Sequence, residues 1–285
     1  MTLRRSAVYA GASRGMEGTS YMQQVKVHPT AIVHPTARLG EGVVIGPWVL
    51  IEEGVCIGDD TSVAARAVVK AGVSMGKGNR IHEGAILGGT PQDLKFRGDV
   101  SRLRIGDGNI IREGVTIHRS THAGGETVVG NENFLMAYAH VAHDCRLEDG
   151  VILANNVCLA GHVTVESHAF LSGGVVVHQF CQVGRYSMVG GNAKVEKDVL
   201  PYFLADGVPA RTRALNLVGL RRHGFTAADI RLLKQAYRIL LGAGKLEERL
   251  AELSALGSAH ADYLVQFVRR SQRGFCRAAT AGDLE

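Results

Sequence analysis

The feature that most constrains this chain is an apolar residue that recurs every six positions between Val25 and Asp198. Counted in hexads from Val25, the third residue is Val, Ile, Leu or Met at 26 of 29 positions. The exceptions are Asp93, Asp99 and Ala123. The first residue of a hexad is usually small or β-branched, and the fourth is often glycine. Chance periodicity in a Gly- and Val-rich chain does not account for a frame that persists over this length.

A six-residue period is not the stripe of an α-helix, which repeats every 3.6 residues. Each hexad instead predicts a short strand, whose first and third residues face the same side, followed by a corner. Three hexads make one triangular coil of 18 residues, so each residue lies above the residue 18 positions earlier. One coil cannot bury its apolar face, but stacked coils share a continuous core. The predicted fold class is therefore an all-β parallel β-helix, a hexapeptide solenoid.

The repeat divides the chain into three parts. Residues 1–21 precede it and lack the apolar stretch of a signal peptide, so we expect a disordered extension, or a start codon assigned too early with Met22 as the natural beginning. Residues 22–201 form the solenoid, and residues 202–285 form a linker and a small helical domain. In that domain Thr226 and Asp229 predict a helix-capping box.

Apolar residues at helical spacing predict three amphipathic helices, one over about 230–241 and two at 246–256 and 259–270. Three such helices enclose little core alone, so we expect them to pack on the solenoid end or on a neighbouring subunit. Before them, four arginines form a basic cluster that suits a diphosphate or an acidic carrier protein, with a solvated helix entrance as the alternative. These are Arg211, Arg213, Arg221 and Arg222.

The composition suits thin coils with tight corners, because there are 36 glycines and aromatic residues make up only 6% of the chain. The five cysteines have neither metal-binding spacing nor an even framework, which favours a reducing, cytoplasmic compartment. The net charge of +5 suits acidic partners and does not require nucleic acid. No apolar run approaches the roughly 20 residues of a membrane span.

Two segments keep the hexad frame but lose its apolar pattern. Residues 91–102 place aspartates where an aliphatic side chain belongs, and an ionised carboxylate in a dry core is costly. We therefore expect this segment to leave the coil as a loop. Loops on a rigid scaffold often carry function, and this one groups Gln92, Asp93 and Lys95; a tolerated insertion is the alternative. Residues 121–126 are a shorter interruption whose glycine pair indicates a mobile or tightly turned loop.

Histidines outside the core positions provide the candidate chemistry. His118, His140, His143, His162 and His178 all lie at hexad positions other than one and three, so none is expected to point into the core. The 18-residue stacking places Gly161 over His143 and Gln179 over Gly161, with His162 one residue further round. For any single histidine, ordinary exposure is the alternative, but here several polar side chains converge on one corner beside a bare backbone.

This corner suits acyl transfer. The imidazole of His143 can remove a proton from an attacking hydroxyl, and Asp144 can orient it or raise its basicity. The N–H of Gly161 can hold the developing oxyanion. No Ser or Cys is placed as a covalent nucleophile beside this histidine, which favours direct transfer over an acyl-enzyme.

With these residues in view, the chain resembles the UDP-N-acetylglucosamine O-acyltransferase family of hexapeptide-repeat enzymes, which begins lipid A synthesis. The resemblance covers about residues 22–275. The hexapeptide repeat alone is shared by many acyltransferases, whereas the histidine segments combined with a helical C-terminus are specific. The segments are Gln92–Lys95, Ile117–Arg119, Ala139–Asp144, Ala154–Asn156, Leu159–His162 and His178–Phe180.

The resemblance implies a left-handed solenoid and a homotrimer with active sites between adjacent solenoids. It also implies transfer of a 3-hydroxyacyl group from acyl carrier protein to the 3-hydroxyl of UDP-N-acetylglucosamine, with no cofactor or metal. His143 matches the general base, Asp144 its supporting carboxylate and Gly161 the oxyanion donor. Gln92, Asp93, Lys95, His140, His162, His178 and Gln179 match substrate contacts. Met188 and Gly191 match the place where acyl length is measured, and a glycine there leaves room for a long chain.

The segment that matches the family's nucleotide contacts departs from its pattern. The family often has Asn-x-Glu-Gly followed by paired basic residues before Gly-Phe. Here Val218 replaces the glutamate and cannot hydrogen-bond a base, and His223 replaces a permanent charge with a titratable one. Asn216 and Arg222 remain, so these two and His223 are the expected contacts. The sequence leaves open the preferred acyl length, and whether the acceptor is the N-acetyl sugar or an amino-substituted relative.

Two other functions are compatible with the same repeat. A metal-dependent hydratase of the γ-carbonic-anhydrase type also uses histidines between left-handed solenoids, but it needs three of them around zinc with an open position. The loop at residues 91–102 and the C-terminal helices argue against it. A non-catalytic scaffold is the other possibility, although it has no need of polar groups stacked on one corner.

Overall fold

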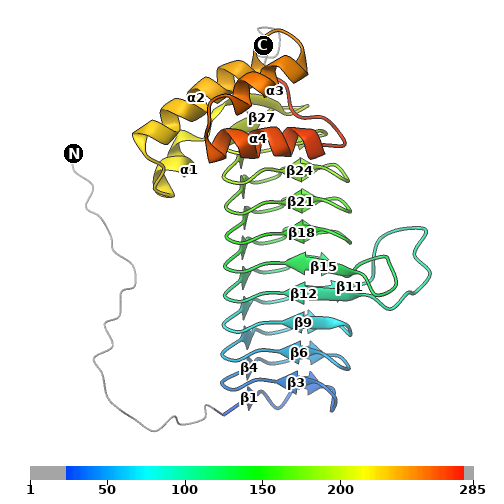
Figure 1. Ribbon diagram of the computed structural model, residues 1–285. Coiled ribbons are helices and arrows are strands. Elements are labelled where there is room, and N and C mark those ends of the chain that lie inside the picture. Colours follow the sequence, from blue (N-terminus) through cyan, green and yellow to red (C-terminus); the bar gives the residue numbers. More distant parts are fainter. Residues whose placement is uncertain (1–23, 279–285) are drawn as a thin grey trace, which may run out of the picture.

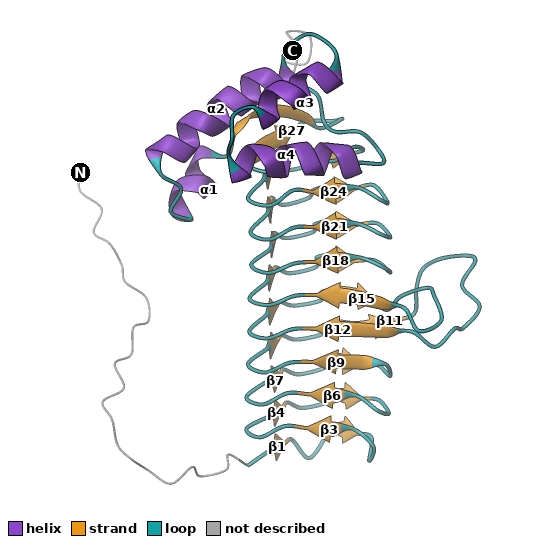
Figure 2. Ribbon diagram, in the orientation of Figure 1, coloured by secondary structure: helices purple, strands orange, loops and turns teal. Residues whose placement is uncertain are grey.

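The computed structural model of the chain describes residues 24–278, so the predicted extension at 1–21 lies outside the described residues. Its main body is a stack of coils whose short parallel strands align into three sheets, with helices at the C-terminal end (Figure 1; Figure 2). This architecture confirms the predicted fold class, a left-handed parallel β-helix with a small helical part.

The three sheets, here called A, B and C, form the three sides of the solenoid. Sheet A contains β1 (Lys26–Val27), β4 (Val44–Ile45), β7 (Ser62–Val63), β10 (Arg80–Ile81), β13 (Ile110–Ile111), β16 (Phe134–Leu135), β19 (Ile152–Leu153), β22 (Phe170–Leu171), β25 (Met188–Val189), β27 (Phe203–Asp206) and β28 (Arg211–Leu215). Sheet B contains β2 (Ile32–Val33), β5 (Leu50–Ile51), β8 (Val68–Val69), β11 (Ile86–Gly89), β14 (Thr116–His118), β17 (His140–Val141), β20 (Cys158–Leu159), β23 (Val176–Val177) and β26 (Lys194–Val195). Sheet C contains β3 (Arg38–Leu39), β6 (Cys56–Ile57), β9 (Val73–Met75), β12 (Arg102–Ile105), β15 (Glu126–Val129), β18 (Arg146–Leu147), β21 (Thr164–Val165) and β24 (Gln182–Val183).

Strand pairing follows the 18-residue interval except at the two interruptions of the repeat. Ser74 pairs with Arg104, 30 positions later, and Arg104 pairs with Val128, 24 positions later. The first interval exceeds 18 by twelve, which is the length of residues 91–102. The second exceeds 18 by six, which is the length of residues 121–126. Both segments leave the coils on the same side of the solenoid, between β11 and β12 and between β14 and β15 (Figure 1).

The core consists of the residues at the third and first hexad positions, which form one continuous cluster along the solenoid. Leu135, Leu153 and Leu171 are fully buried at the third position of successive coils. Val27 holds the same position in the first coil but is 44% exposed, because no described residue covers that end. Burial therefore depends on having a coil above and below, as expected for stacked repeats.

Corner residues at the sixth hexad position turn the chain in the left-handed backbone region. Many are glycine, such as Gly150 with φ of 66°, but Asp144 and His162 have φ of 60° and 61°. Asp, Asn and His tolerate this conformation better than most side chains. The corners are thus the places where the fold accepts polar side chains that stand clear of the core.

Four helices follow the solenoid: α1 (Leu217–Arg222), α2 (Ala227–Leu241), α3 (Leu246–Ser254) and α4 (Ala259–Arg270). The predicted capping box of α2 is confirmed, because Thr226 Oγ1 accepts from the Asp229 N–H and the Asp229 carboxylate accepts from the Thr226 N–H. Leu233 and Phe267 share a second core with Leu200 at the solenoid end. The helices therefore pack on that end, and none within residues 24–278 is long and apolar enough to cross a membrane.

The stacked core predicts that Leu153→Ala lowers the free energy of unfolding by about 2–5 kcal/mol, because the truncation leaves a cavity in an interior closed by coils on both sides. Denaturant unfolding followed by circular dichroism measures the loss. Arg146→Ala, at an exposed position of the adjacent β18, is the control, with an expected change within about 0.5 kcal/mol. Equal losses in the two variants would contradict a core at the third hexad position.

Candidate active site

Successive coils bring the predicted residues to one corner between sheets B and C. The strands on both sides of this corner pair at 18-residue intervals from β17 to β24, so the stacking predicted from the sequence is confirmed. The hexad position-five column contains His143, Gly161 and Gln179, and the position-six column contains Asp144, His162 and Phe180.

His143 and Asp144 form a hydrogen-bonded pair at this corner. Nδ1 of His143 lies 2.8 Å from Oδ2 of Asp144, and the two side chains are 13% and 8% exposed. The Asp144 N–H donates to the Thr127 hydroxyl at 2.8 Å, which fixes the turn behind the carboxylate. Because Nδ1 is engaged, Nε2 is the nitrogen of His143 that remains to accept a proton.

The Asp144 carboxylate is held as an anion by hydroxyl donors from the coil below. Ser120 Oγ donates to Oδ1, and Thr121 Oγ1 donates to Oδ2 at 2.7 Å. Burial by itself raises the pKa of Asp144, but the hydrogen bonds from Ser120, Thr121 and His143 outweigh it and lower the pKa to about 2. The pair therefore consists of an imidazole beside a permanent negative charge.

Gly161 is pressed against the ring of His143. A Cβ atom at position 161 would lie 2.4 Å from Cε1 and 2.8 Å from Nε2 of His143, so any side chain here would displace the imidazole. The Gly161 N–H donates to no acceptor among residues 24–278. The corner thus combines a proton acceptor with an adjacent uncommitted backbone donor, which is the arrangement that a developing oxyanion needs.

His162 completes the corner. Its Nε2 lies 3.6 Å from Oδ2 of Asp144, and its ring stacks on Phe180 with centroids 4.6 Å apart and planes 14° apart. Burial lowers the pKa of His162, and the Asp144 charge only partly opposes this shift. A neutral imidazole can donate one hydrogen bond and accept another, which suits a polar ligand such as a sugar hydroxyl.

His140 and His118 lie side by side below this corner, with ring centroids 4.8 Å apart. Nδ1 of His140 lies 2.7 Å from Thr116 Oγ1, and burial with the nearby His143 lowers the pKa of His140. His118 is outside the solenoid core, as predicted, but it is only 8% exposed because Gly89 packs against its ring. Burial lowers the pKa of His118 to about 4.

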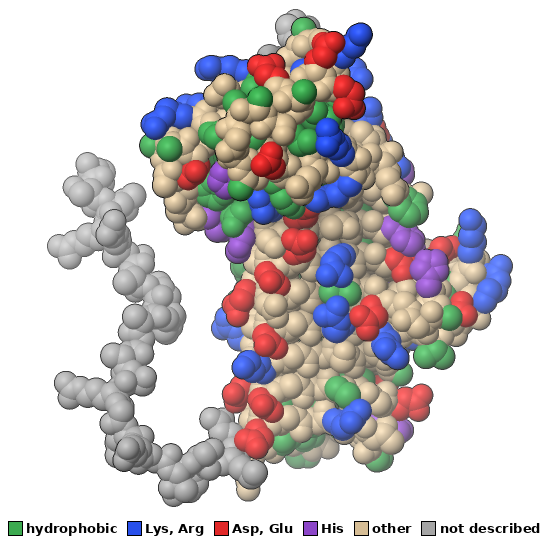
Figure 3. Space-filling view, viewed as in Figure 1, with side chains coloured by type: hydrophobic (Ala, Val, Ile, Leu, Met, Phe, Trp, Pro, Cys, Tyr) green, Lys and Arg blue, Asp and Glu red, His purple; other side chains and the backbone are tan. Residues whose placement is uncertain are grey.

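The loop at residues 91–102, here called the first loop, stands over the corner and borders two adjoining pockets with it. One, of about 400 Å³, is bordered by Gln92, His140, His143, Gly161 and Gln179 together with sheet B residues. The other, of about 530 Å³, is bordered by the loop's Gln92, Asp93, Leu94 and Lys95 and by His143, His162, Gln179 and Phe180. Histidine side chains are visible at the surface beside the projecting loops in Figure 3. His143 lies between the two pockets, so a ligand in either pocket reaches it.

The loop is fixed by contacts to its neighbours. The loop at residues 121–126 is here called the second loop. Its Gly124 N–H donates to the Val100 carbonyl at 2.8 Å, which links the two loops. The Arg119 guanidinium lies over the Phe96 ring, 5.6 Å from its centroid. The polar group predicted from the sequence is thus positioned toward the His143 corner rather than away from it.

The predicted substrate contact His178 and the predicted acyl-length residues Met188 and Gly191 lie outside these pockets. His178 is exposed, and its Nδ1 lies 3.1 Å from the Gln179 carbonyl oxygen. Met188 is on β25 of sheet A, and Gly191 follows in the turn from sheet A to sheet B. Within one chain, Met188 and Gly191 therefore lie at a different corner from His143.

The predicted nucleotide contacts gather around α1, where two of them already have internal partners. Asn216 is buried and caps α1, with its side chain accepting from the Gly219 N–H at 3.0 Å and donating to the Tyr186 carbonyl at 2.9 Å. His223 ends the helix, with Nδ1 2.9 Å from the Gly219 carbonyl oxygen and its ring against Tyr186. Arg222 is exposed.

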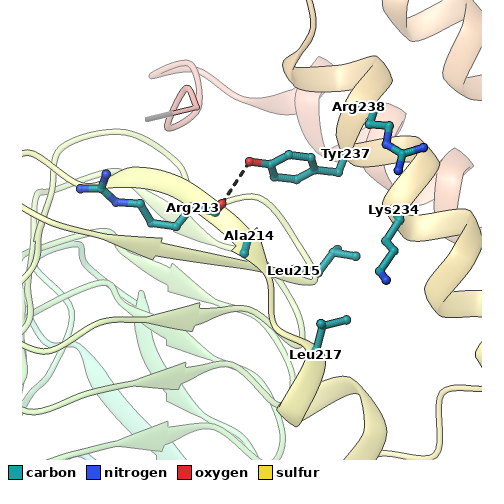
Figure 4. A pocket seen from close by; sticks show the side chains of 7 residues that line it. All are labelled: Arg213, Ala214, Leu215, Leu217, Lys234, Tyr237 and Arg238. Carbon is teal, nitrogen blue, oxygen red and sulfur yellow. Dashed lines mark hydrogen bonds between the residues drawn. The ribbon is translucent and has the colours of Figure 1, made fainter. Parts of the chain in front are cut away.

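A basic pocket of about 300 Å³ lies between β28 and α2. Lys234 and Arg238 extend from α2, and Leu215 and Leu217 form an apolar wall opposite them (Figure 4). The Tyr237 hydroxyl donates to the Arg213 carbonyl at 3.1 Å and anchors α2 on β28 (Figure 4). This surface combines cations with apolar contacts, a combination that suits an acidic protein partner.

Sequence reasoning missed four residues of the corner, which are Ser120, Thr121, Thr127 and Phe180. Ser120 lies one coil below Asp144, but the six extra residues of the second loop make the interval 24 instead of 18. Counting columns across each insertion would have found it. Phe180 lies 18 residues after His162, so the same counting would have found it as well.

The described residues also include a group that can hold a metal ion. His122, Asp144 and His162 each offer one ligand atom, and these atoms lie within 4.8 Å of one another. The set contains two histidines and a carboxylate, whereas the γ-carbonic-anhydrase type requires three histidines. Asp144 is moreover already bound to His143, so the geometry fits the base-and-carboxylate interpretation better than a hydratase.

Comparisons with known proteins agree with this geometry. Residues 198–276 match the family described as "Udp N-acetylglucosamine O-acyltransferase; Domain 2", and residues 126–161 match the bacterial transferase hexapeptide repeat. The chain is 45% identical over 256 residues to the acyl-[acyl-carrier-protein]–UDP-N-acetylglucosamine O-acyltransferase of Alkalilimnicola ehrlichii, covering 88% of this chain and 99% of that one.

The solved structures give the same result. The crystal structure of a UDP-N-acetylglucosamine acyltransferase from Bacteroides fragilis superposes with a TM-score of 0.86 at 42% identity, over 88% of this chain and all of that one. The Francisella novicida UDP-N-acetylglucosamine acyltransferase superposes with a TM-score of 0.85 at 34% identity, over 91% of this chain and 96% of that one. On these grounds the chain belongs to the family of acyl-[acyl-carrier-protein]–UDP-N-acetylglucosamine O-acyltransferases.

Proposed function

We propose that this protein transfers a 3-hydroxyacyl chain from acyl carrier protein to the 3-hydroxyl of UDP-N-acetylglucosamine, the first step of lipid A biosynthesis. The observation that carries the proposal is the His143–Asp144 pair, whose imidazole lies against Gly161, a residue with an uncommitted N–H. Family membership gives the substrate class, and the corner supplies the groups that the reaction needs.

In the proposed reaction, Nε2 of His143 takes the proton of the sugar hydroxyl as its oxygen attacks the thioester carbonyl. The Gly161 N–H stabilises the negative oxygen of the tetrahedral intermediate. The C–S bond then breaks, the proton on His143 passes to the departing thiolate, and the ester and free carrier thiol are released. No covalent enzyme intermediate is proposed, because no Ser or Cys among the described residues hydrogen-bonds to His143; the thiol of Cys158, which borders the same pocket, instead donates to the Asn156 carbonyl oxygen.

Asp144 acts through His143. Its carboxylate accepts the Nδ1 proton at 2.8 Å, which keeps Nε2 unprotonated and oriented toward Gly161. When His143 takes up the substrate proton, the same carboxylate stabilises the imidazolium. The hydroxyls of Ser120 and Thr121 keep this charge in place during the cycle.

The residues around the two pockets are proposed to position the substrates. Asp93, Lys95 and His162 border the pocket beside the first loop and offer donors and acceptors to the sugar. Gln92 and Gln179 border both pockets, and His140 borders the pocket on the sheet B side. His178 is proposed to complete the set from the exposed side of Gln179.

Uridine and diphosphate contacts are assigned to Asn216, Arg222 and His223. Of these, Arg222 is the best placed to meet a phosphate, because its side chain is exposed while Asn216 and His223 make internal hydrogen bonds. Val218 is 59% exposed on α1 and presents no polar atom from its side chain.

We infer a homotrimer from the outward faces of the three sheets. The outer row of sheet A contains Ile110, Phe134, Ile152, Phe170 and Met188, and that of sheet B begins with Ile32, Leu50, Val68 and Ile86. The outer row of sheet C is mostly polar, with only Cys56 and Val128 among Arg38, Ser74, Arg104, Arg146, Thr164 and Gln182, and Figure 3 shows charges of both signs on that face. A triangular prism that meets two neighbours about a threefold axis covers two sides and leaves the third to water.

A trimer also gives Met188 and Gly191 a place in the reaction. Within one chain they lie at a different corner from His143, so they can border the acyl chain only across an interface. A side chain at position 191 would meet only the Gly173 carbonyl oxygen, at an ordinary 3.5 Å, so glycine is not required there by the fold. Its small size is therefore proposed to leave room for a long chain.

The acidic carrier protein is proposed to dock on the basic surface formed by Lys234, Arg238 and Arg213. A carrier protein of this kind is cytoplasmic, and five free cysteines are compatible with a reducing compartment. We therefore propose a cytoplasmic location.

The decisive test incubates purified protein with UDP-N-acetylglucosamine and a panel of 3-hydroxyacyl carrier proteins, beside His143→Ala. Removing the general base is expected to lower transfer by about 10²–10⁴-fold. Circular dichroism and light scattering should show an unchanged fold and a trimer in both proteins, because His143 supports no core. A variant with near-normal rate would refute the assigned base, and light scattering at the mass of one chain would refute the trimer.

Asp144→Asn tests the supporting carboxylate. The pKa of Asp144 in the folded protein is about 2, below the ordinary value of 3.8. The charge of Asp144 therefore stabilises the folded protein fully above pH 3.8, and this contribution is lost as the pH falls toward 2. The amide variant should therefore lose at least on the order of 10²-fold in kcat at about pH 7, where the wild-type carboxylate is fully ionised. A near-normal rate at neutral pH would remove Asp144 from its supporting role.

Gly191→Met tests the acyl pocket. A methionine fits the backbone at this position, so the variant should fold, and its side chain should shift the preferred donor toward shorter 3-hydroxyacyl chains. Competition between donors of different length in one reaction measures the shift. Gly173→Ala, at the contact beside it, controls for a local change of the turn. An unchanged preference in Gly191→Met would remove this residue from the acyl site.

A further inference from the structure

We propose that His122, Asp144 and His162 form a binding site for one divalent transition-metal ion such as Zn²⁺, and that this ion inhibits the enzyme. The inhibitory part rests on the proposed function, whereas the binding part does not. The second loop carries His122, and the catalytic corner carries the other two residues.

The three ligand atoms are already close to a coordination geometry. They lie within 4.8 Å of one another, and His162 Nε2 is 3.6 Å from Asp144 Oδ2. Ligand atoms around Zn²⁺, with bonds of about 2.0–2.2 Å, lie about 3–3.5 Å apart. Moving the His122 ring inward by at most about 1.3–1.8 Å would therefore be enough to close the site, because no two of the ligand atoms are more than 4.8 Å apart. The rings of His122 and His162 have centroids 6.0 Å apart and are tilted by 48°, so they do not block each other.

The positions of the three residues suit capture of an ion from solution. His122 is exposed, while its backbone is fixed by an N–H donated to Ser120 Oγ at 3.1 Å. Asp144 and His162 are partly buried and held by their neighbours. One side chain is thus accessible and adjustable, and the other two are preorganised.

The ligand types select the class of ion. Two imidazoles and one carboxylate are a common donor set for Zn²⁺, Co²⁺, Ni²⁺ and Fe²⁺, and they leave positions for water. The second group of this kind, His82, Glu83 and Glu113, is a weaker candidate. The Arg112 guanidinium donates to the Glu113 carboxylate at 2.8 Å, so a cation already occupies that group.

Binding here should oppose catalysis instead of assisting it. Oδ2 of Asp144 is the atom that accepts the His143 Nδ1 proton, so a metal ion on this oxygen competes with the base for its partner. A doubly charged ion beside His143 also disfavours the imidazolium that forms when the base takes up a proton. In addition, the ion removes His162 from the pocket where the sugar is proposed to bind.

The binding experiment uses the full-length protein freed of metal with a chelator. Titration with Co²⁺, followed by its visible absorption bands, and calorimetry with Zn²⁺ should each show one tight site per chain. His122→Ala should weaken that site by on the order of 100-fold, because one of three protein ligands is gone. His82→Ala, which alters the other group, should leave it unchanged. Equal affinity in wild type and His122→Ala, or loss of the site in His82→Ala, would overturn the proposal.

The activity experiment adds Zn²⁺ to the transfer assay. Metal-free wild type should be fully active and lose activity as the site fills, whereas His122→Ala should have the same basal rate and require at least about tenfold more Zn²⁺ for half inhibition. Metal-free wild type that is inactive until Zn²⁺ is added would overturn an inhibitory site. Absence of transfer with every donor, alongside normal Co²⁺ binding, would count against the proposed function and not against the metal site.

Discussion

Stacking of apolar side chains along the solenoid axis is the constraint on which the rest of the structure depends. Each coil buries its residues only against the coils above and below, and the exposed Val27 at the first coil shows what happens without a neighbour. Because the strands also hydrogen-bond from coil to coil, neighbouring coils are held about 4.8 Å apart. Residues of one column therefore have a fixed spacing, and this spacing, more than any local feature, sets the distance between His143 and Gly161.

The repeat made most of this predictable from sequence. The fold class and the column of His143, Gly161 and Gln179 followed from counting, since a period of 18 assigns each residue its neighbours in space. The loop at residues 91–102 was predictable because burying an ionised carboxylate in the core is costly, so a segment with aspartates at core positions has to leave the coil. Helix α2 followed from its capping box and apolar face.

Other parts of the structure depend on side-chain contacts that the 18-residue period does not specify. Asn79, Asn109 and Asn133 are buried at the first hexad position, where an apolar or small residue was expected. They are linked from coil to coil because the Asn109 N–H donates to Asn79 Oδ1 and the Asn133 N–H donates to Asn109 Oδ1. Asn216 looked available for a ligand, but its amide caps α1 and bonds to Tyr186. Contacts of this kind need coordinates, because they join residues whose separation the repeat does not fix.

The same spacing determines which groups this corner offers to a ligand. The backbone N–H at hexad position five is not used by the strand ladder, and at several corners an aspartate one coil above takes it: Asp59 accepts from Glu41, Asp107 from Lys77 and Asp149 from Asn131. Above Gly161 the residue is Gln179, and no described residue accepts from the Gly161 N–H. The aspartate of this corner lies instead at position six, where a left-handed turn and two hydroxyl donors aim it at His143. A carboxylate at position six thus leaves the backbone donor of Gly161 open for a ligand and gives the imidazole its partner, and these are the two halves of the proposed acyl-transfer site.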